Sequence, residues 1–534
     1  MREFTRHLRP RMAAFFVYAA VSCAPGVPFV RAAESGTSGG TARLDVWEYY
    51  VSGNTVLDDS AIAEALAPYL GPSRSPDDVD QARAALEAAY RQRGYKTVGV
   101  AIPQQTVHDG VVRLDVVEAS VGHLNVIGSK YHSIERIKEQ VPSLAEGKVP
   151  DFDEVQTDIV AVNQQSDRRV TPALKAGSAP GTVDVDLVVD DDLPLHGSFE
   201  LNNRKSQDTS SLRALASVSY DNLWQRGHSL NLSYQTAPEN VEDARVFYGS
   251  YLARFGSSPF SLLLSGLRSD SNVSTVGGTD VVGNGTVIGV RGVWAFPATE
   301  TFYSSISFGV DYKRFRNRVS LKGDSFVTPI EYYPFALGYS GVLRQGSATT
   351  QFDIGARFAM RDWGSDSEVF MLNRSYARGQ QFSVRASLQQ SLSLPAGFEL
   401  RARLGGQITD EALISNEQFS AGGLDSVRGY LEAEVLGDQG VDASLELHGP
   451  SLFSKSGFIK QFAVYAFVDG AQLNLRDATP DQDAEVSIAS SGIGLDLQLW
   501  SALHGALTWA APFKDGPATQ AWDSRALFRV WTDF

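Results

Sequence analysis

From Gly197 to Phe534 the chain consists of strand-length segments in which apolar and polar residues alternate. In one segment Leu230, Leu232 and Tyr234 occupy every second position, with polar residues between them. Successive side chains of a β-strand point to opposite faces, so each such segment has one apolar and one polar face. About 340 residues of this pattern favour a large all-β domain.

Alternation of this kind occurs in membrane β-barrels with a polar lumen and in soluble β-sandwiches or propellers. Many of the segments reach about ten residues, enough for a tilted strand to cross a bilayer. Aromatic residues such as Trp294 and Phe302 stand at segment ends, as in interfacial girdles. We therefore predict a membrane all-β barrel of about 16 antiparallel strands over residues 193–534. The longest gap between predicted strands is about 410–439.

The chain ends in a predicted strand that carries Phe528, Val530 and the terminal Phe534. This ending resembles the assembly signal of bacterial outer-membrane barrels. The resemblance implies outer-membrane lipid around the barrel and recognition by the barrel assembly machinery.

Residues 1–32 have the pattern of a secretory signal peptide, with an arginine-rich start, an apolar run and a small-residue cleavage site at Ala32. A transmembrane helix is disfavoured because Pro25 and Pro28 interrupt the run. Cys23, the single cysteine, allows a lipoprotein site as another alternative and excludes a disulfide framework. Residues 33–43 form a short Gly/Ser/Thr-rich linker, in which we expect no helix.

Residues 44–119 and 120–192 repeat one order of predicted elements: strand, two helices, two strands. In the first repeat we expect a strand from Leu44 to Ser52 and a second helix capped by Asp77. Two α+β units of about 75 residues, joined in tandem, have the organisation of POTRA (polypeptide-transport-associated) domains.

The first repeat resembles the POTRA domain of haemolysin secretion transporters in a run of signature residues: Gly94, Tyr95, Pro103, Gln104, Gln105 and Gly110. Pro103 suits a strand end or a sheet edge, and Gly110 suits a turn. The resemblance implies that the two repeats are periplasmic and capture an unfolded polypeptide by strand addition. Inert α+β spacers are the alternative.

Two motifs in the barrel half combine opposite charges. Val427, Arg428, Gly429 and Tyr430 lie in the gap near 410–439, and Phe467, Asp469 and Gly470 lie on a later predicted strand. Alternation along that strand places Asp469 on the polar, lumen face. An arginine can donate two parallel hydrogen bonds to a carboxylate, so we predict that Arg428 pairs with Asp469 across the lumen. A solvated turn and a solvated aspartate are the alternative.

Together these features resemble the two-partner secretion transporters of the TpsB type, in which both motifs occur and an inward-folded sixth loop carries the first. Ala471 departs from that family, which has glycine there, and this leaves the local turn at Gly470 in doubt. The resemblance implies an outer-membrane pore that exports a secreted partner polypeptide without nucleotide hydrolysis. A barrel insertase and a passive porin are the alternatives.

Several function classes find no support in the sequence. The net charge of −15 disfavours nucleic-acid binding, and catalytic, phosphate-loop and metal motifs are absent. We expect no enzyme activity, cofactor or metal. We interpret His123 and His132 as surface residues, and 190–192 as a solvated interdomain acidic run.

Overall fold

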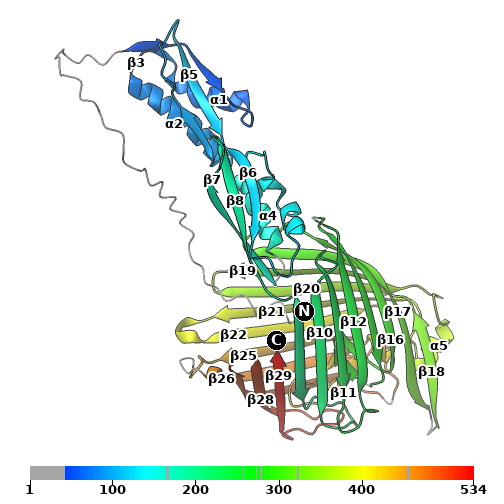
Figure 1. Ribbon diagram of the computed structural model, residues 1–534. Helices are drawn as coiled ribbons and strands as arrows, with labels where there is room; N and C mark the ends of the chain where they lie inside the picture. The colour runs from blue at the N-terminus through cyan, green and yellow to red at the C-terminus, as the bar shows by residue number, and fades with distance from the viewer. Residues whose placement is uncertain are drawn as a thin grey trace. The chain divides into compact units, whose positions relative to one another are not determined.

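The computed structural model of the chain describes residues 43–163, 167–256, 258–271, 273–276, 279–321, 324–361, 363–453, 458–480 and 482–534. The side chains of residues 273–276, 279–282, 317–321 and 324–326 are not described. The chain divides into two compact units, one ending at Leu193 and one running from Pro194 to Phe534 (Figure 1). The predicted signal peptide lies outside the described residues. Within the described ranges, no helix has both the length and the apolar character needed to cross a membrane.

The first repeat packs two helices on one face of a three-stranded sheet. Its elements are β1 (Leu44–Val46), β2 (Glu48–Ser52), α1 (Asp59–Leu66), η2 (Ala67–Tyr69), β3 (Gly71–Arg74), α2 (Pro76–Gln92), β4 (Val98–Ala101) and β5 (Val111–Glu118). The sheet order is β2-β5-β4, and Leu86 and Tyr90 of α2 pack on Leu114 of β5. Two expectations were wrong in detail: the first strand is divided, and Ser75, not Asp77, caps α2. The Ser75 hydroxyl accepts from the Asp78 N–H while the Asp78 carboxylate accepts from the Ser75 N–H.

The second repeat has the same architecture. Its elements are β6 (Ser120–Ile127), α3 (Ile134–Glu139), η3 (Pro142–Leu144), α4 (Phe152–Val162), β7 (Arg168–Ala176) and β8 (Thr182–Asp191). The sheet order is β6-β8-β7, with β6 parallel and β7 antiparallel to the central strand. Ile137 and Leu144 pack on Val185 and Leu187 in a core that is separate from that of the first repeat.

Equivalent glycines end the first long strand of each repeat. Gly53 follows β2 with φ +83°, and Gly128 follows β6 with φ +93°. A Cβ at these positions would lie 2.3 Å from the carbonyl oxygen of Val116 and 2.4 Å from that of Val189, respectively. In both repeats the chain thus passes close to the backbone of the central strand, β5 or β8, at the equivalent place. A side chain would clash there, so the position requires glycine.

The interpretation was wrong for His132 and, within the acidic run 190–192, for Asp191, whereas Asp190 and Asp192 are exposed as expected. The side chains of His132 and Asp191 are 3% and 0% exposed, and His132 Nδ1 lies 2.6 Å from Asp191 Oδ1. The other carboxylate oxygen accepts from the backbone N–H groups of Lys130, Tyr131 and His132. Asp191 therefore organises the turn after β6, because a buried carboxylate needs several donors. His123, in contrast, is exposed as expected.

The second unit is a closed antiparallel barrel (Figure 1). Its strands are β9 (Leu195–Asn202), β10 (Arg213–Leu223), β11 (His228–Thr236), β12 (Arg245–Arg254), β13 (Phe260–Ser269), β16 (Gly285–Ala295), β17 (Phe302–Leu321), β18 (Asp324–Tyr332), β19 (Phe335–Gln345), β20 (Ala348–Ala359), β21 (Gln381–Ser393), β22 (Glu399–Thr409), β25 (Gln439–His448), β26 (Ile459–Asn474), β27 (Glu485–Leu499), β28 (Leu503–Pro512) and β29 (Arg525–Asp533). β18 and β19 both pair with β17 and meet at Pro334, so they count as one interrupted strand. The barrel therefore has 16 strands, which confirms the predicted fold class.

The two faces of the barrel wall follow the sequence alternation. On β26, Val464 and Val468 are 47% and 49% exposed, whereas Tyr465 and Phe467 between them are buried. β9 and β29 close the barrel through five register pairs, from Arg529↔Asn202 to Asp533↔Ser198. We use near end for the rim where the chain enters β9, and far end for the opposite rim.

Candidate functional site

The longest connection of the barrel joins β22 to β25 at the far end and folds into the lumen; we call residues 410–438 loop 6. It contains η5 (Ser415–Glu417) and a small sheet of β23 (Phe419–Ala421) and β24 (Val435–Gly437). The four residues of the predicted motif, 427–430, are all buried in the middle of the loop. A surface turn would leave them exposed, so loop 6 forms part of the barrel interior.

Arg428 and Asp469 lie in direct contact. The Arg428 Nε and Nη2 atoms donate to the Asp469 carboxylate oxygens at 2.7 Å each, and the Arg428 backbone N–H donates at 3.1 Å. Nη1 lies 2.7 Å from Glu446, and Nη2 donates to the Ser444 hydroxyl at 3.1 Å. The guanidinium carbon lies 3.6 Å from the ring centre of Phe467. The buried cation is thus paired, hydrogen-bonded and stacked at once.

The neighbours of Arg428 fix its place in the lumen. Gly429 has φ +98°, a conformation that favours glycine. The Tyr430 hydroxyl lies 3.2 Å from the carbonyl oxygen of Ala489 and 2.8 Å from that of Lys514. Val427 packs in an apolar cluster with residues of β23, β26 and β27. The motif therefore contacts the barrel wall on both sides of the arginine.

The second motif contains no turn. β26 continues unbroken from Ile459 to Asn474, and Gly470 pairs with Ala443 on β25 and Ala489 on β27. Ala471 is buried on the lumen face. Alanine is therefore accommodated there within a regular strand, which removes the doubt about a local turn.

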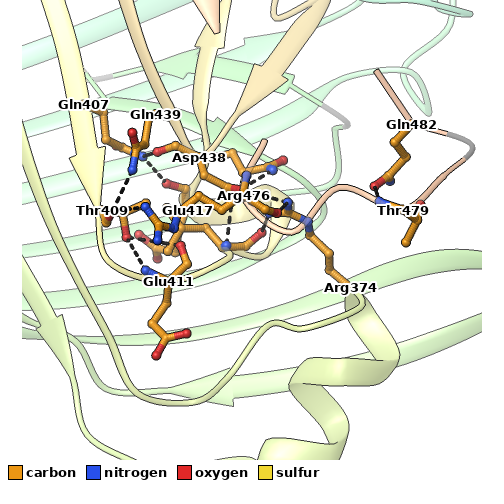
Figure 2. A network of polar contacts seen from close by, with 12 residues as sticks. Arg374, Gln407, Thr409, Glu411, Glu417, Asp438, Gln439, Arg476, Thr479 and Gln482 are labelled. Carbon is orange, nitrogen blue, oxygen red and sulfur yellow. Dashed lines mark hydrogen bonds and ion pairs between the residues drawn. The ribbon is translucent and has the colours of Figure 1, made fainter. Parts of the chain in front are cut away.

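A second set of polar contacts holds the far-end base of loop 6 (Figure 2). The Asp438 side chain is 0% exposed, and Arg374, in the connection between β20 and β21, donates to both of its oxygens. Asp438 also accepts from the backbone N–H of Leu413 at 3.0 Å, the Gln418 amide at 3.1 Å and the backbone N–H of Arg476 at 2.7 Å. One carboxylate thus joins loop 6 to the two neighbouring connections.

Further carboxylates tie loop 6 to strands across the lumen. Glu417 pairs with Lys313 of β17 and accepts from the Tyr332 hydroxyl of β18 at 2.7 Å. Glu432 accepts from Nε and Nη2 of Arg204, just after β9, at 2.9 and 3.0 Å. The sequence analysis identified none of these residues. In the sequence these residues are distinguished only by a charge beside a predicted strand end. Many solvated residues have the same feature, so it does not identify them.

Two of the signature residues of the first repeat lie at its joint with the second repeat. Gly94 has φ +89°, and its carbonyl accepts from the Phe152 N–H of α4 at 3.0 Å. A Cβ on Gly94 would lie 2.1 Å from the Asp151 carboxylate. Tyr95 packs on the first core together with Val149. These positions shape the joint between the repeats.

Two of the other signature residues, Gln105 and Gly110, stabilise the end of the first sheet. The Gln105 side chain accepts from the Arg113 N–H and donates to the Arg113 carbonyl, both at 2.8 Å, so it continues the ladder beyond β4. Gly110 has φ +75°, and a Cβ there would lie 2.4 Å from the Trp47 ring. Pro103 and Gln104 lie in the same connection after β4.

The C-terminal residues lie at the barrel seam. Phe528 and Val530 share the lipid-facing side of β29, where Val530 is 44% exposed. The backbone of Phe534 exchanges hydrogen bonds with Gly197 of β9 at 3.0 and 3.1 Å. A Cβ on Gly197 would lie 2.2 Å from the Phe534 ring, so the ring covers the bare backbone.

Comparison with known proteins identifies relatives of both the barrel and the first repeat. Residues 181–497 match the family model of the haemolysin secretion/activation proteins ShlB/FhaC/HecB, and residues 44–119 match the ShlB-type POTRA domain. The outer membrane transporter CdiB of Dickeya dadantii is 21% identical over 420 residues, 72% of this chain and 69% of that protein. The heme/hemopexin transporter protein HuxB of Haemophilus influenzae is 20% identical over 425 residues, 76% of this chain and 72% of its own.

Solved structures show the same fold. CdiB from Escherichia coli superimposes with a TM-score of 0.66 at 19% identity, covering 95% of this chain and 93% of that one. BamA from Haemophilus ducreyi lacking POTRA domains 1–3 gives a TM-score of 0.56 at 16% identity, covering 92% and 100%. The chain belongs to the haemolysin secretion/activation (ShlB/FhaC/HecB) family of two-partner secretion transporters, with its barrel in the outer membrane and its POTRA repeats in the periplasm.

Proposed function

We propose that the chain captures an unfolded partner polypeptide in the periplasm and passes it through the barrel to the cell exterior, without nucleotide hydrolysis. The near end of the barrel is periplasmic, because the POTRA repeats precede β9. The far end, with loop 6 and the Asp438 contacts, is extracellular. Folding of the cargo outside would give the direction of transport.

The way in which loop 6 is held carries this proposal. Beside the apolar cluster around Val427, loop 6 is held to the wall by ion pairs and hydrogen bonds through Arg428, Glu417, Glu432 and Asp438. Water can replace such contacts when a polar lumen is hydrated, whereas an apolar plug exposes its surface at a cost. A loop held in this way closes the pore at rest and can be displaced by a passing chain. Loop 6 is therefore the gate.

The POTRA repeats supply the capture surface. In the described sheets, β2 and β4 of the first repeat and β6 and β7 of the second have one partner strand each. Edge strands present unpaired backbone donors and acceptors, so they can bind extended chains of many sequences. β7 carries Pro172, which lacks a backbone N–H, and so offers an interrupted edge.

A neighbouring reading frame that encodes an exported, β-rich protein would supply the cargo, and secretion of that cargo tests the proposal. We expect the cargo in the medium with the intact transporter, and its loss when residues 44–119 are deleted. Arg428→Glu should also abolish secretion, and Arg428→Glu combined with Asp469→Arg should restore part of it. Normal cargo with depleted outer-membrane barrels would contradict export and indicate an insertase.

A further inference from the structure

The lipid-facing wall of the barrel has an open groove that runs over β10–β13 and β16. Its volume is about 660 Å³, within the range of about 300–1,000 Å³ found for ligand sites. Gly249 of β12 and Gly266 of β13 are register partners and form its floor. Leu232 and Ile288 pair with these glycines on the outer sides and form its walls. They are 48% and 50% exposed, so the groove opens towards lipid.

The groove exists because side chains are missing from the floor. A Cβ on Gly266 would meet nothing within 4 Å, and one on Gly249 would lie 3.3 Å from a methyl group of Leu232 and 3.8 Å from the carbonyl oxygen of Asn231. A larger residue would therefore fit at Gly266 without disturbing the backbone, and one at Gly249 would require the Leu232 side chain to shift. Glycine within a strand weakens the sheet and often marks close approach of a ligand.

Arg268 lines the extracellular end of the groove, and Arg314 lies beyond it. Arg268 lies two residues after Gly266 on the same face of β13, and its register partner is Thr286, which pairs in turn with Arg314 of β17. Both arginines are exposed. Arg245 forms an ion pair with Asp270 at 2.7 Å, whereas Arg268 has no such partner among the described carboxylates. Among the described carboxylates Arg268 therefore has no counterion at the bilayer surface, whereas Arg314 has Glu331 as its register partner on β18.

An apolar groove with arginines at its extracellular end favours a ligand that has both an acyl chain and phosphate groups. An apolar groove in the outer leaflet fits an acyl chain, and an arginine at the interface can bind two phosphate oxygens with its planar fork. Arg268 and Arg314 lie on strands separated by one other strand, so their Cα atoms are about 10 Å apart. We propose that this groove binds a multiply acylated lipid of the outer leaflet that carries two phosphate groups. One acyl chain lies over Gly249 and Gly266, and the phosphates contact Arg268 and Arg314.

Native mass spectrometry of the full-length protein in detergent tests this site, with lipid A, phosphatidylglycerol and inorganic phosphate as separate probes. Gly266→Leu fills the groove and keeps the arginines; Arg268→Gln and Arg314→Gln remove charge and keep the groove. Gly505→Leu is the matched control for the first change, because Gly505 also has open space and pairs with the exposed Val530. Lys460→Gln, at an exposed lysine near the periplasmic end of β26, controls for loss of a charge.

We expect the wild type and both controls to retain lipid A. Gly266→Leu and each arginine variant should reduce retention about five-fold or more, which corresponds to about 1 kcal/mol per arginine at a membrane surface. Equal retention by all variants would overturn the site. Sensitivity to the arginines alone, with Gly266→Leu unaffected, would overturn the acyl-chain placement. Equal binding of phosphatidylglycerol would overturn the assignment to a lipid with two phosphates.

Discussion

Asp438→Asn should release the base of loop 6 and shift the pore towards its open state. The change keeps the size of the side chain but replaces one acceptor oxygen with an NH₂ group. If the amide oxygen takes the Oδ1 position, the NH₂ group faces Arg374 Nη2 and the Arg476 N–H, which both donate to Oδ2. Two hydrogen bonds to a charged acceptor are lost, and the Arg374 cation loses its counterion.

The size of the effect follows from these contacts. Each hydrogen bond to a charged group contributes about 1.5–3 kcal/mol, so the loss of two costs at least about 3 kcal/mol. The expected cost of breaking a buried ion pair is of the same order, about 3–5 kcal/mol. A change of about 3 kcal/mol shifts an equilibrium by about two orders of magnitude. The ratio of released to docked loop 6 should therefore rise about 100-fold.

Single-channel recording in planar bilayers measures this ratio as the ratio of open to closed dwell times. Gln482→Ala is the control, because among the described residues the Gln482 side chain accepts from the Thr479 N–H of the same connection and does not contact loop 6 (Figure 2). Combining Asp438→Asn with Arg374→Met should recover part of the closed state, since no unpaired cation then remains. Unchanged dwell times in Asp438→Asn, or purely additive effects in the double variant, would refute a clamp at this position.

Three further outcomes follow from other contacts. Arg428→Lys should reduce secretion strongly while the protein still assembles, because a lysine cannot reproduce the paired contacts with Asp469; secretion equal to wild type would contradict this. Gly110→Ala should lower the free energy of unfolding of the first repeat by about 1–2 kcal/mol through strain at φ +75° and contact with Trp47, seen by hydrogen exchange in that repeat. The pKa of Asp191 is lowered: burial raises it, but donors from Tyr131, His132 and Lys130 outweigh burial. Its stabilising contribution is therefore present above its unfolded pKa of about 3.9 and is lost as the pH falls through the lower folded pKa. The stability difference between wild type and Asp191→Asn in chemical denaturation should accordingly shrink in acid; a constant difference would contradict the assignment.

Local pattern predicted the barrel because burial on one face imposes a period of two on every strand, and that period is visible in single segments. The same reasoning placed Asp469 on the lumen face of β26, where the structure has it. It could not predict the Asp438 contacts, because Arg374 and Arg476 come from different connections whose meeting depends on the closed barrel. His132 was misjudged for a related reason: its partner Asp191 lies 59 residues away, and a lone histidine does not reveal its burial.

The charged anchors of loop 6 at Arg428, Glu417 and Glu432 fall into two groups that differ in what the proposed opening motion must break. Arg428 is bound to β25 and β26, the strands that follow the loop directly, so these contacts can move with the loop end. Glu417 and Glu432 bind residues on β17 and beside β9, which lie across the lumen from that wall. Loop 6 is tethered between β22 and β25. It can therefore break the Glu417 and Glu432 contacts, keep the Arg428 contacts, and fold back against the wall formed by β25 and β26. On the proposed gating by loop 6, opening by that route needs no rupture of the Arg428–Asp469 pair, which would then act as the pivot, with Glu417 and Glu432 as the releasable ends once the Asp438 contacts have opened.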